Sequence, residues 1–258
     1  MNNLFDYENK IKARIKNGEI SMGVFLLSGS SFIAEAMANM DIDWMVIDLE
    51  ASHASKEDVL HILQALNPYA VTPIIRVAEH NKHFIEFGLD YGARGIMVPK
   101  IDTVKQAAEM IKACYYPPKG ERGMNCIRAS GYYTRSVSYL KNANDCTLTI
   151  FQIESKESMA NLSGIAQVAE IDILFVGLGD LSASYGYLGN IAGKEMNEAR
   201  QKVIDACTKY DKIPGIFAHS PELVSQYIKE GFKFIAIGND VKFLQQGFSD
   251  SLKKITGK

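Results

Sequence analysis

Residues 148–180 read LTIFQIESKESMANLSGIAQVAEIDILFVGLGD, and their pattern decides the fold class. Two apolar runs that are rich in β-branched residues, 148–154 and 172–178, flank a segment whose apolar residues recur at helical spacing. Such runs suit buried strands, and the segment between them is long enough for a helix that connects two parallel strands. The stretch therefore predicts a strand–helix–strand unit of a parallel sheet.

The same alternation extends over the rest of the chain. Six further apolar runs lie at 22–27, 44–49, 73–77, 94–99, 214–218 and 232–238. Each is followed by a segment of helical periodicity, and several of these segments begin at a Ser, Thr, Asn or Asp suited to capping. Eight such repeats favour an eight-stranded (β/α) barrel, a TIM-barrel α/β fold, over a doubly wound sheet, which the pattern alone leaves open. We predict one domain over residues 1–258, a length that such barrels reach as a single unit.

Three segments depart from the repeat. An amphipathic helix is predicted at 6–16, where Phe5 begins its apolar face. Residues 115–145 are rich in Tyr, Arg, Gly and Pro and predict a long loop after the fourth helix of the repeat, of the kind used as a lid or an interface. The C-terminal segment 240–255 predicts a helix with an apolar stripe that suits subunit contacts, although packing on its own barrel fits the pattern equally well. The stripe consists of Val241, Leu244, Phe248, Leu252 and Ile255.

Composition excludes several classes of protein. With 47% hydrophobic and 22% charged residues the chain can bury a core, and its net charge of -2 without a basic stripe argues against nucleic-acid binding. The N-terminus is polar, and no apolar run approaches the ~18 residues of a spanning helix, so we expect a cytoplasmic protein without a membrane segment. The four cysteines form no CxxC pair and are expected to be reduced thiols.

Two carboxylates end neighbouring strands of the predicted barrel. The active site of such a barrel collects at the C-terminal ends of its strands, and Glu154 and Asp180 occupy those positions on sequential strands. Their carboxylates can converge on one point and suit an ion that prefers oxygen, such as Mg²⁺ or Mn²⁺. The alternative is that each carboxylate caps the helix or turn that follows it.

Other strand ends suggest a site for an anion. Arg76 ends a buried strand, where a guanidinium needs an anionic partner; that partner is either a substrate carboxylate or enolate, or an internal Asp or Glu. Gly177 and Gly179 permit a close backbone approach, so the N–H groups of Gly179 and Asp180 could hold an anionic oxygen.

Two histidines follow strand ends. His53 comes a few residues after the second strand and can either act as a general base or lie on the surface. His219 follows the seventh strand and could line the mouth. His61 lies within a helix candidate and is interpreted as structural. His80 and His83 stand three residues apart at a helix start, a spacing that could bind a metal ion, although a solvated helix start explains it better.

Read together, these pieces resemble the class II metal-dependent pyruvate aldolases, the family of 4-hydroxy-2-oxoheptanedioate aldolase, within the superfamily of phosphoenolpyruvate- and pyruvate-binding barrels. The similarity runs over nearly the whole chain. The segments that carry it are VIDLE (46–50), IIRV (74–77), LDYGARGIMVPKIDT (89–103), YYPPKGERG (115–123), FQIESKESMANL (151–162) and FVGLGDLSASYGYLGN (175–190).

The resemblance implies roles for the residues at these strand ends. Glu154 and Asp180 resemble the two ligands of a divalent metal ion, Mg²⁺ or Mn²⁺, with Co²⁺ and others left open. Gln152 and the backbone at Gly179 and Asp180 resemble contacts to the bound 2-oxo acid. Arg76 resembles the arginine that stabilises the enolate. The implied reaction cleaves a 4-hydroxy-2-oxo acid to pyruvate and an aldehyde, or adds them, through a metal-stabilised pyruvate enolate.

The chain departs from the family at the general base. These aldolases carry a histidine directly after the glutamate of the second-strand motif, and Asp90 resembles the acid that orients it. Here the motif reads VIDLEASHAS (46–55), so Ala51 takes the place of the histidine and His53 stands two residues later. We expect either that a local turn brings His53 to the substrate as the base, or that a metal-bound water does this work more slowly.

The resemblance also implies an assembly and leaves two other functions open. A homo-oligomer is expected, a hexamer built as a dimer of trimers, with small molecules as its other partners. One alternative is a related lyase or transferase that acts on another enolisable or phosphorylated acid. The other is a barrel that binds a 2-oxo acid without turnover.

Overall fold

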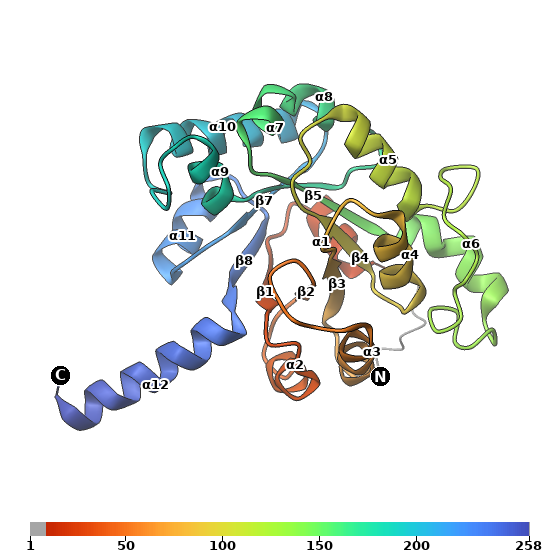
Figure 1. Ribbon diagram of the computed structural model, residues 1–258, viewed down its shortest axis with the longest axis horizontal. Coiled ribbons are helices and arrows are strands. Elements are labelled where there is room, and N and C mark those ends of the chain that lie inside the picture. Colours follow the sequence, from red (N-terminus) through yellow and green to blue (C-terminus); the bar gives the residue numbers. More distant parts are fainter. Residues whose placement is uncertain (1–8, 258) are drawn as a thin grey trace.

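The chain forms a closed barrel of eight parallel strands arranged in sequence order (Figure 1), as a computed structural model of residues 9–257 shows. The strands are β1 (Ser21–Leu26), β2 (Trp44–Asp48), β3 (Thr72–Arg76), β4 (Gly95–Val98), β5 (Leu148–Ile153), β6 (Ile173–Val176), β7 (Ile213–Phe217) and β8 (Phe234–Asn239). Each matches its predicted run within two residues at either end. The TIM-barrel prediction is thereby confirmed.

Helices join successive strands around the barrel, and two more precede the first strand and follow the last. They are α1 (Lys10–Lys16), α2 (Ser31–Ala38), α3 (Lys56–Ala65), α4 (Lys82–Asp90), α5 (Val104–Cys114), α6 (Ser136–Cys146), α7 (Lys156–Ala160), α8 (Leu162–Ala166), α9 (Leu178–Ser184), α10 (Lys194–Lys209), α11 (Pro221–Glu230) and α12 (Asp240–Thr256). Side-chain caps fix many of their starts, as at Ser55 and Thr103, where reciprocal capping boxes form. The helix expected between β5 and β6 is split into α7 and α8 at Asn161.

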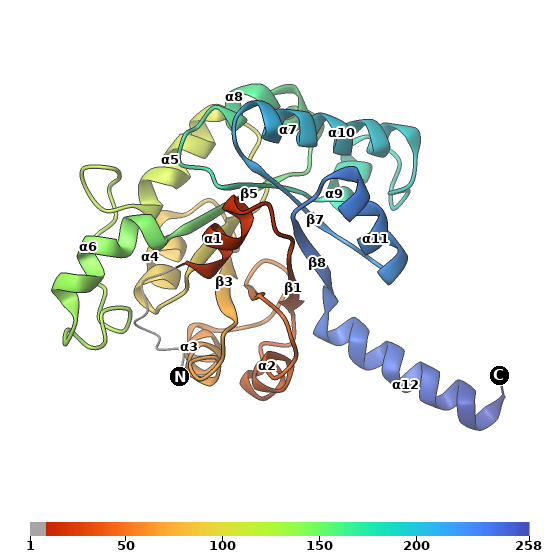
Figure 2. The same ribbon diagram turned by 180° about the vertical axis from the view of Figure 1, so that it is seen from behind.

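The N-terminal helix α1 closes the bottom of the barrel (Figure 2). Its Ile11 and Ile15 are buried among the side chains that fill the barrel interior. Asn9 caps the helix and donates a hydrogen bond of 2.7 Å to the carbonyl of Cys146, which holds the helix in place. The predicted N-terminal helix is confirmed in this part, whereas Phe5 lies outside the described residues. The site must therefore open at the other end of the barrel.

A tryptophan fills the interior near the bottom of the barrel. Trp44 is fully buried and stacks on Phe234, with 4.0 Å between the ring centroids and 6° between the ring planes. Gly23 makes this possible, because a Cβ there would lie 2.2 Å from atoms of Trp44. β1 pairs with both β2 and β8, so the stacked rings lie where the first and last strands close the barrel.

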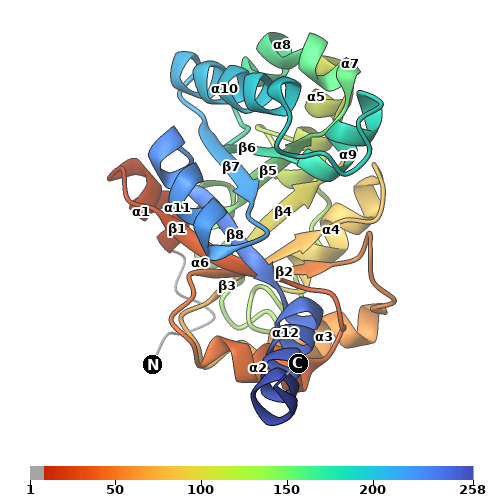
Figure 3. The same cartoon turned by 90° about the vertical axis from the view of Figure 1, so that its left-hand side faces the viewer.

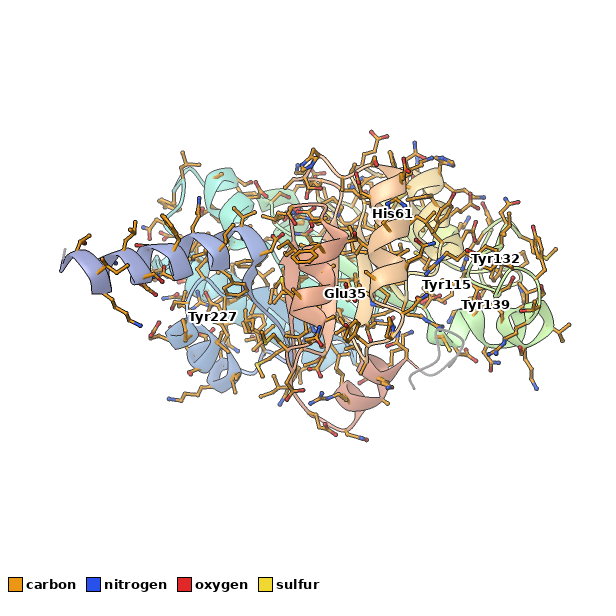
Figure 4. The ribbon with its side chains drawn as sticks, turned by 90° about the horizontal axis from the view of Figure 1, so that it is seen from below. Glu35, His61, Tyr115, Tyr132, Tyr139 and Tyr227 are labelled. Atoms are coloured by element: carbon orange, nitrogen blue, oxygen red, sulfur yellow. The ribbon has the colours of Figure 1, made fainter. Side chains whose placement is uncertain are left out.

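The segment 115–145 is only partly the loop that was predicted. Its last part forms α6, because Tyr139 and Ala143 recur at helical spacing and pack with Tyr116 in a small separate core. Figure 4 shows Tyr132 and Tyr139 together on the side of the molecule away from α12.

The C-terminal helix α12 extends away from the barrel (Figures 1 and 3). Its first residue, Asp240, is its one buried residue, and the Asp240 carboxylate accepts hydrogen bonds of 2.9 and 3.0 Å from the N–H groups of Leu27 and Ser28. The apolar stripe lies open to solvent, from 41% exposed at Val241 to 81% at Ile255. The interpretation that this stripe packs on its own barrel is therefore wrong.

Two further expectations concern cysteines and membranes. All four cysteines are free and buried. Burial raises the pKa of the Cys114 and Cys207 thiols to about 12, which disfavours the reactive thiolate. Within residues 9–257, every helix is too short or too polar to span a lipid bilayer.

Candidate metal and substrate site

A pocket of about 220 Å³ opens at the C-terminal end of the barrel, where the strand ends meet. Five of the residues predicted for the site line it together: Arg76, Gln152, Glu154, Gly179 and Asp180. The volume is small beside the ~300–1,000 Å³ of typical ligand pockets, so it suits a small acid.

Glu154 is the most strongly perturbed acid of the pocket. It is only 3% exposed; one carboxylate oxygen accepts the N–H of Lys100 at 2.7 Å and the other accepts the side-chain amide of Gln152 at 2.9 Å. The pKa of Glu154 is raised to about 7, chiefly by burial and also by the negative charges of Asp180 and Glu50, against the N–H of Lys100 and the charge of Arg76, which lower it. The carboxylate thus lies where additional positive charge would be favourable.

Two backbone features place Glu154 there. Gly177 leaves the space that the carboxylate occupies, because a Cβ at this position would lie 2.2 Å from a Glu154 oxygen. Lys100 has a φ of 53°, in the left-handed region that a residue with a side chain rarely adopts, at a cost of about 1–3 kcal/mol. Its N–H points at Glu154 in this conformation. Of the two glycines singled out in the sequence, Gly177 therefore accommodates the acid, and Gly179 is open to the pocket.

Neither carboxylate serves as a helix cap. Ser155, not Glu154, caps α7 with its hydroxyl, and the N-cap of α9 is Gly177, which has no side chain to cap it. Asp180 lies exposed in the first turn of α9. The N–H groups of Gly179 and Asp180 belong to that same turn, where helix geometry leaves N–H groups without intrahelical partners. The exposed carboxylate of Asp180 and these N–H groups are thus available to a ligand, and the carboxylate of Glu154 lines the same pocket.

The residues present fit a divalent cation held by two carboxylates. Over residues 9–257, no group of three or more His, Cys, Asp or Glu side chains converges in a way that could hold a metal ion. A cation at Glu154 and Asp180 would therefore complete its coordination with oxygens from water and substrate. Such an all-oxygen set suits Mg²⁺ or Mn²⁺.

Arg76 has internal partners and also faces the pocket. Its Nε and Nη2 atoms lie 2.8 and 2.5 Å from the two oxygens of Asp48, and its Nη1 atom lies 3.0 Å from Glu50. The internal-carboxylate alternative is thus realised. The guanidinium also lies over the ring of Phe25 and 3.4 Å from the amide oxygen of Gln152. The two acids hold the guanidinium in a fixed orientation at the pocket wall.

The structure places His53 outside the pocket. After β2 the chain turns tightly, because the Asp48 carboxylate accepts the N–H groups of Glu50 and Ala51 at 3.0 and 3.3 Å. This turn directs Ala51 to the pocket. His53 is exposed and absent from the pocket lining, so the turn does not carry its imidazole to the site.

The structure places Asp90 away from the pocket of its own chain. Asp90 is the last residue of α4, a helix that runs antiparallel to the strands, so it lies at the bottom of the barrel. There it is buried in an ion pair with Arg122, whose Nη2 atom is 2.6 Å away. Asp90 cannot orient a histidine in the pocket of the same chain. Arg122 belongs to the segment 115–145, none of whose residues lines the pocket, so the segment is not a lid over it.

Aromatic residues form a wall of the pocket that sequence reasoning missed. Phe25, Phe175 and Phe217 line it from β1, β6 and β7, and Asn239 lines it at the end of β8. Their positions near strand ends could have indicated that they line the pocket. Apolar residues on strands are, however, ordinarily assigned to the hydrophobic core. His219 lines the pocket, as its place after β7 predicted.

Known proteins share both the sequence pattern and the barrel. The HpcH/HpaI aldolase/citrate lyase family matches residues 21–246. The 2-keto-3-deoxy-L-rhamnonate aldolase of Escherichia coli O17:K52:H18 is 36% identical over 245 residues, which are 95% of this chain and 90% of that enzyme. An HpcH/HpaI aldolase/citrate lyase family protein from Burkholderia cenocepacia J2315 has a TM-score of 0.93 at 32% identity, over 96% of this chain and 100% of its own. The citrate synthase SbnG has a TM-score of 0.87 at 25% identity, over 95% of this chain and 97% of its own.

Proposed function

Because the chain belongs to the HpcH/HpaI aldolase/citrate lyase family and is an aldolase-type lyase, we propose that it depends on a divalent metal ion and acts on a 4-hydroxy-2-oxo acid. The proposed reaction cleaves this acid to pyruvate and an aldehyde, and the reverse reaction adds the two. Mg²⁺ or Mn²⁺ is the proposed ion.

One observation carries the proposal: the buried carboxylate of Glu154 shares a small pocket with Asp180 and Arg76. A buried acid next to a second acid is unfavourable unless a cation or a proton compensates the charge. A 2-oxo acid brings the complementary groups, because its carboxylate and keto oxygens can complete the coordination of such a cation.

Five residues of the pocket have a part in this proposal. Glu154 and Asp180 hold the cation, which would act as a Lewis acid toward the oxygens of the 2-oxo acid. Gln152 and the N–H groups of Gly179 and Asp180 orient the carboxylate of the acid. Arg76, fixed by its two internal acids, stabilises the negative charge that develops on the keto oxygen. No lysine Schiff base is required.

Two measurements test the proposal. Calorimetric titration should show Mg²⁺ or Mn²⁺ binding to the wild type and none to Glu154→Ala or Asp180→Ala. Glu109→Ala, on the exposed face of α5, is the matched control and should bind the ion normally. In D₂O the wild type should exchange the methyl protons of pyruvate only when the metal is present. Unchanged metal affinity in both site variants would remove the central claim.

The relatives suggest which substrate to assay first. The enzyme that is 36% identical to this chain is named for 2-keto-3-deoxy-L-rhamnonate. We propose a sugar-derived acid of this type as the first candidate. Metal-dependent release of pyruvate from it would support the aldolase over the related lyases and over a barrel that only binds.

We also propose that the protein works as a homo-oligomer, a hexamer built as a dimer of trimers. The exposed apolar stripe of α12 supports an assembly. Beside the first turn of α12, an apolar cavity of about 350 Å³ is lined by Met37 of α2 and by Met40, which follows that helix, together with Ile237 and Phe243. A second copy of the chain would cover both surfaces, which a monomer leaves in water.

A further inference from the structure

The pocket lacks a histidine at the position where the resemblance places the base of the proposed reaction. Proton transfer at neutral pH calls for a group that titrates near pH 7, most often a histidine. Ala51 stands where the resemblance predicts this residue, and His53 is exposed outside the pocket. Over residues 9–257, the histidine that lines the pocket is His219, which follows β7 on the other side of the barrel mouth from β2.

His219 is held in position by contacts on both its ring and its backbone. The imidazole packs on Phe217, with 4.9 Å between the ring centroids. Phe217 in turn packs edge-on against Phe25 at 5.5 Å, and the guanidinium of Arg76 lies over Phe25. The ammonium of Lys242 donates a hydrogen bond of 2.7 Å to the carbonyl of His219. A continuous wall of contacts thus joins the imidazole to the arginine of the pocket.

We propose that His219 is the acid–base residue of this pocket and performs the task for which position 51 has no functional group. The inference rests on the proposed aldolase function. In the addition, a neutral ring nitrogen accepts a proton from the methyl carbon of pyruvate as the enolate forms. The enolate carbon then bonds to the carbonyl carbon of the aldehyde, and the resulting alkoxide takes the proton back from the imidazolium. In the cleavage, the ring accepts the proton of the 4-hydroxyl, the C3–C4 bond breaks, and C3 receives the proton.

The surroundings of His219 agree with this role. Partial burial of its ring lowers the pKa of His219, and the nearby ammonium of Lys242 lowers it further. The proposed cation would compensate the negative charges of Glu154 and Asp180, the two acids of the pocket. The imidazole is therefore neutral and able to accept a proton at pH 7.

The decisive assay is deuterium exchange into pyruvate with saturating Mn²⁺. His219→Ala should lower the exchange rate by about 10²–10⁴-fold, with unchanged Mn²⁺ affinity in calorimetry. His61→Ala is the matched control, because His61 is exposed on α3 (Figure 4) and should exchange at the wild-type rate. Added imidazole should restore part of the activity of His219→Ala. The double variant His219→Ala, Ala51→His should also recover it, because its new imidazole faces the same pocket from the side of β2.

Several results would overturn the role of His219. Wild-type exchange in His219→Ala would do so, as would loss of exchange in His53→Ala instead. A raised KM for the aldehyde with unaltered exchange would assign His219 to aldehyde binding and refute the acid–base role. If the wild type itself fails to exchange with metal present, the proposed aldolase function fails first, and this role fails with it.

Discussion

Replacing Arg76 by lysine separates the charge of this residue from its geometry. The guanidinium spans the two oxygens of the fully buried Asp48 at 2.8 and 2.5 Å and reaches Glu50 at 3.0 Å. A lysine ammonium can retain the charge and one of these contacts, but it cannot bridge both acids in one plane. Each charge-assisted hydrogen bond is worth about 1.5–3 kcal/mol, and new contacts of the lysine offset part of the loss. We expect the free energy of unfolding to fall by about 2–4 kcal/mol.

The activity should fall as well. Without the fork, the positive charge is no longer held at the pocket wall, so pyruvate exchange should drop by one or more orders of magnitude while metal binding persists. Urea denaturation followed by circular dichroism measures the stability, and exchange in D₂O measures the activity. Arg14→Lys is the matched control for stability. Arg14 pairs with Asp43 and its side chain is 43% exposed, so this substitution should lower the free energy of unfolding by no more than about 1 kcal/mol. If Arg76→Lys is as stable as this control and exchanges at the wild-type rate, the reasoning is refuted.

Three other perturbations have defined outcomes. The pKa of Glu154 rises from 4.5 to about 7 on folding, so between these pH values the folded protein binds more protons than the unfolded chain. Without metal, the free energy of unfolding should therefore fall by up to about 3 kcal/mol as the pH rises from 4.5 to 7. Urea titrations with a chelator measure this dependence, and Glu154→Gln should remove it. Gly23→Ala should destabilise the barrel by about 3 kcal/mol or more in thermal denaturation, because its Cβ would overlap Trp44, whereas Gly247→Ala on α12 meets open space and should be neutral or stabilising. Phe248→Asp should lower the molar mass in light scattering; a wild-type monomer at micromolar concentration would contradict the oligomer.

The strand ends were predictable because of the geometry of the barrel. Once eight strand–helix repeats are recognised, the residues at the tips of neighbouring strands must share one face, which is why Glu154, Asp180 and Arg76 were found together. The conformation of short turns was not predictable in this way. Whether Ala51 or His53 enters the pocket depends on two hydrogen bonds to Asp48, and periodicity carries no information about them.

The position of Asp90 was likewise not predictable from the strand pattern. Its role came from resemblance alone, and the direction of α4 was not weighed: a residue at the end of a returning helix lies a whole barrel height from the strand tips. The partial error over 115–145 arose because Tyr, Arg, Gly and Pro were read as loop formers. Tertiary packing of Tyr139 and Ala143 against Tyr116 overrode these local preferences and formed α6.

The ring of Trp44 provides the protein with its own optical label. It is the only tryptophan of the chain, and it is fully buried against Phe234 at the closure of the barrel. Its emission should be blue-shifted and inaccessible to acrylamide while β1, β2 and β8 stay paired, and it should redshift when they separate. Because the ring lies among the interior residues at the opposite end from the pocket mouth, ligands and pocket variants should leave the spectrum unchanged. A spectral change on substrate binding would then report a movement of the barrel itself.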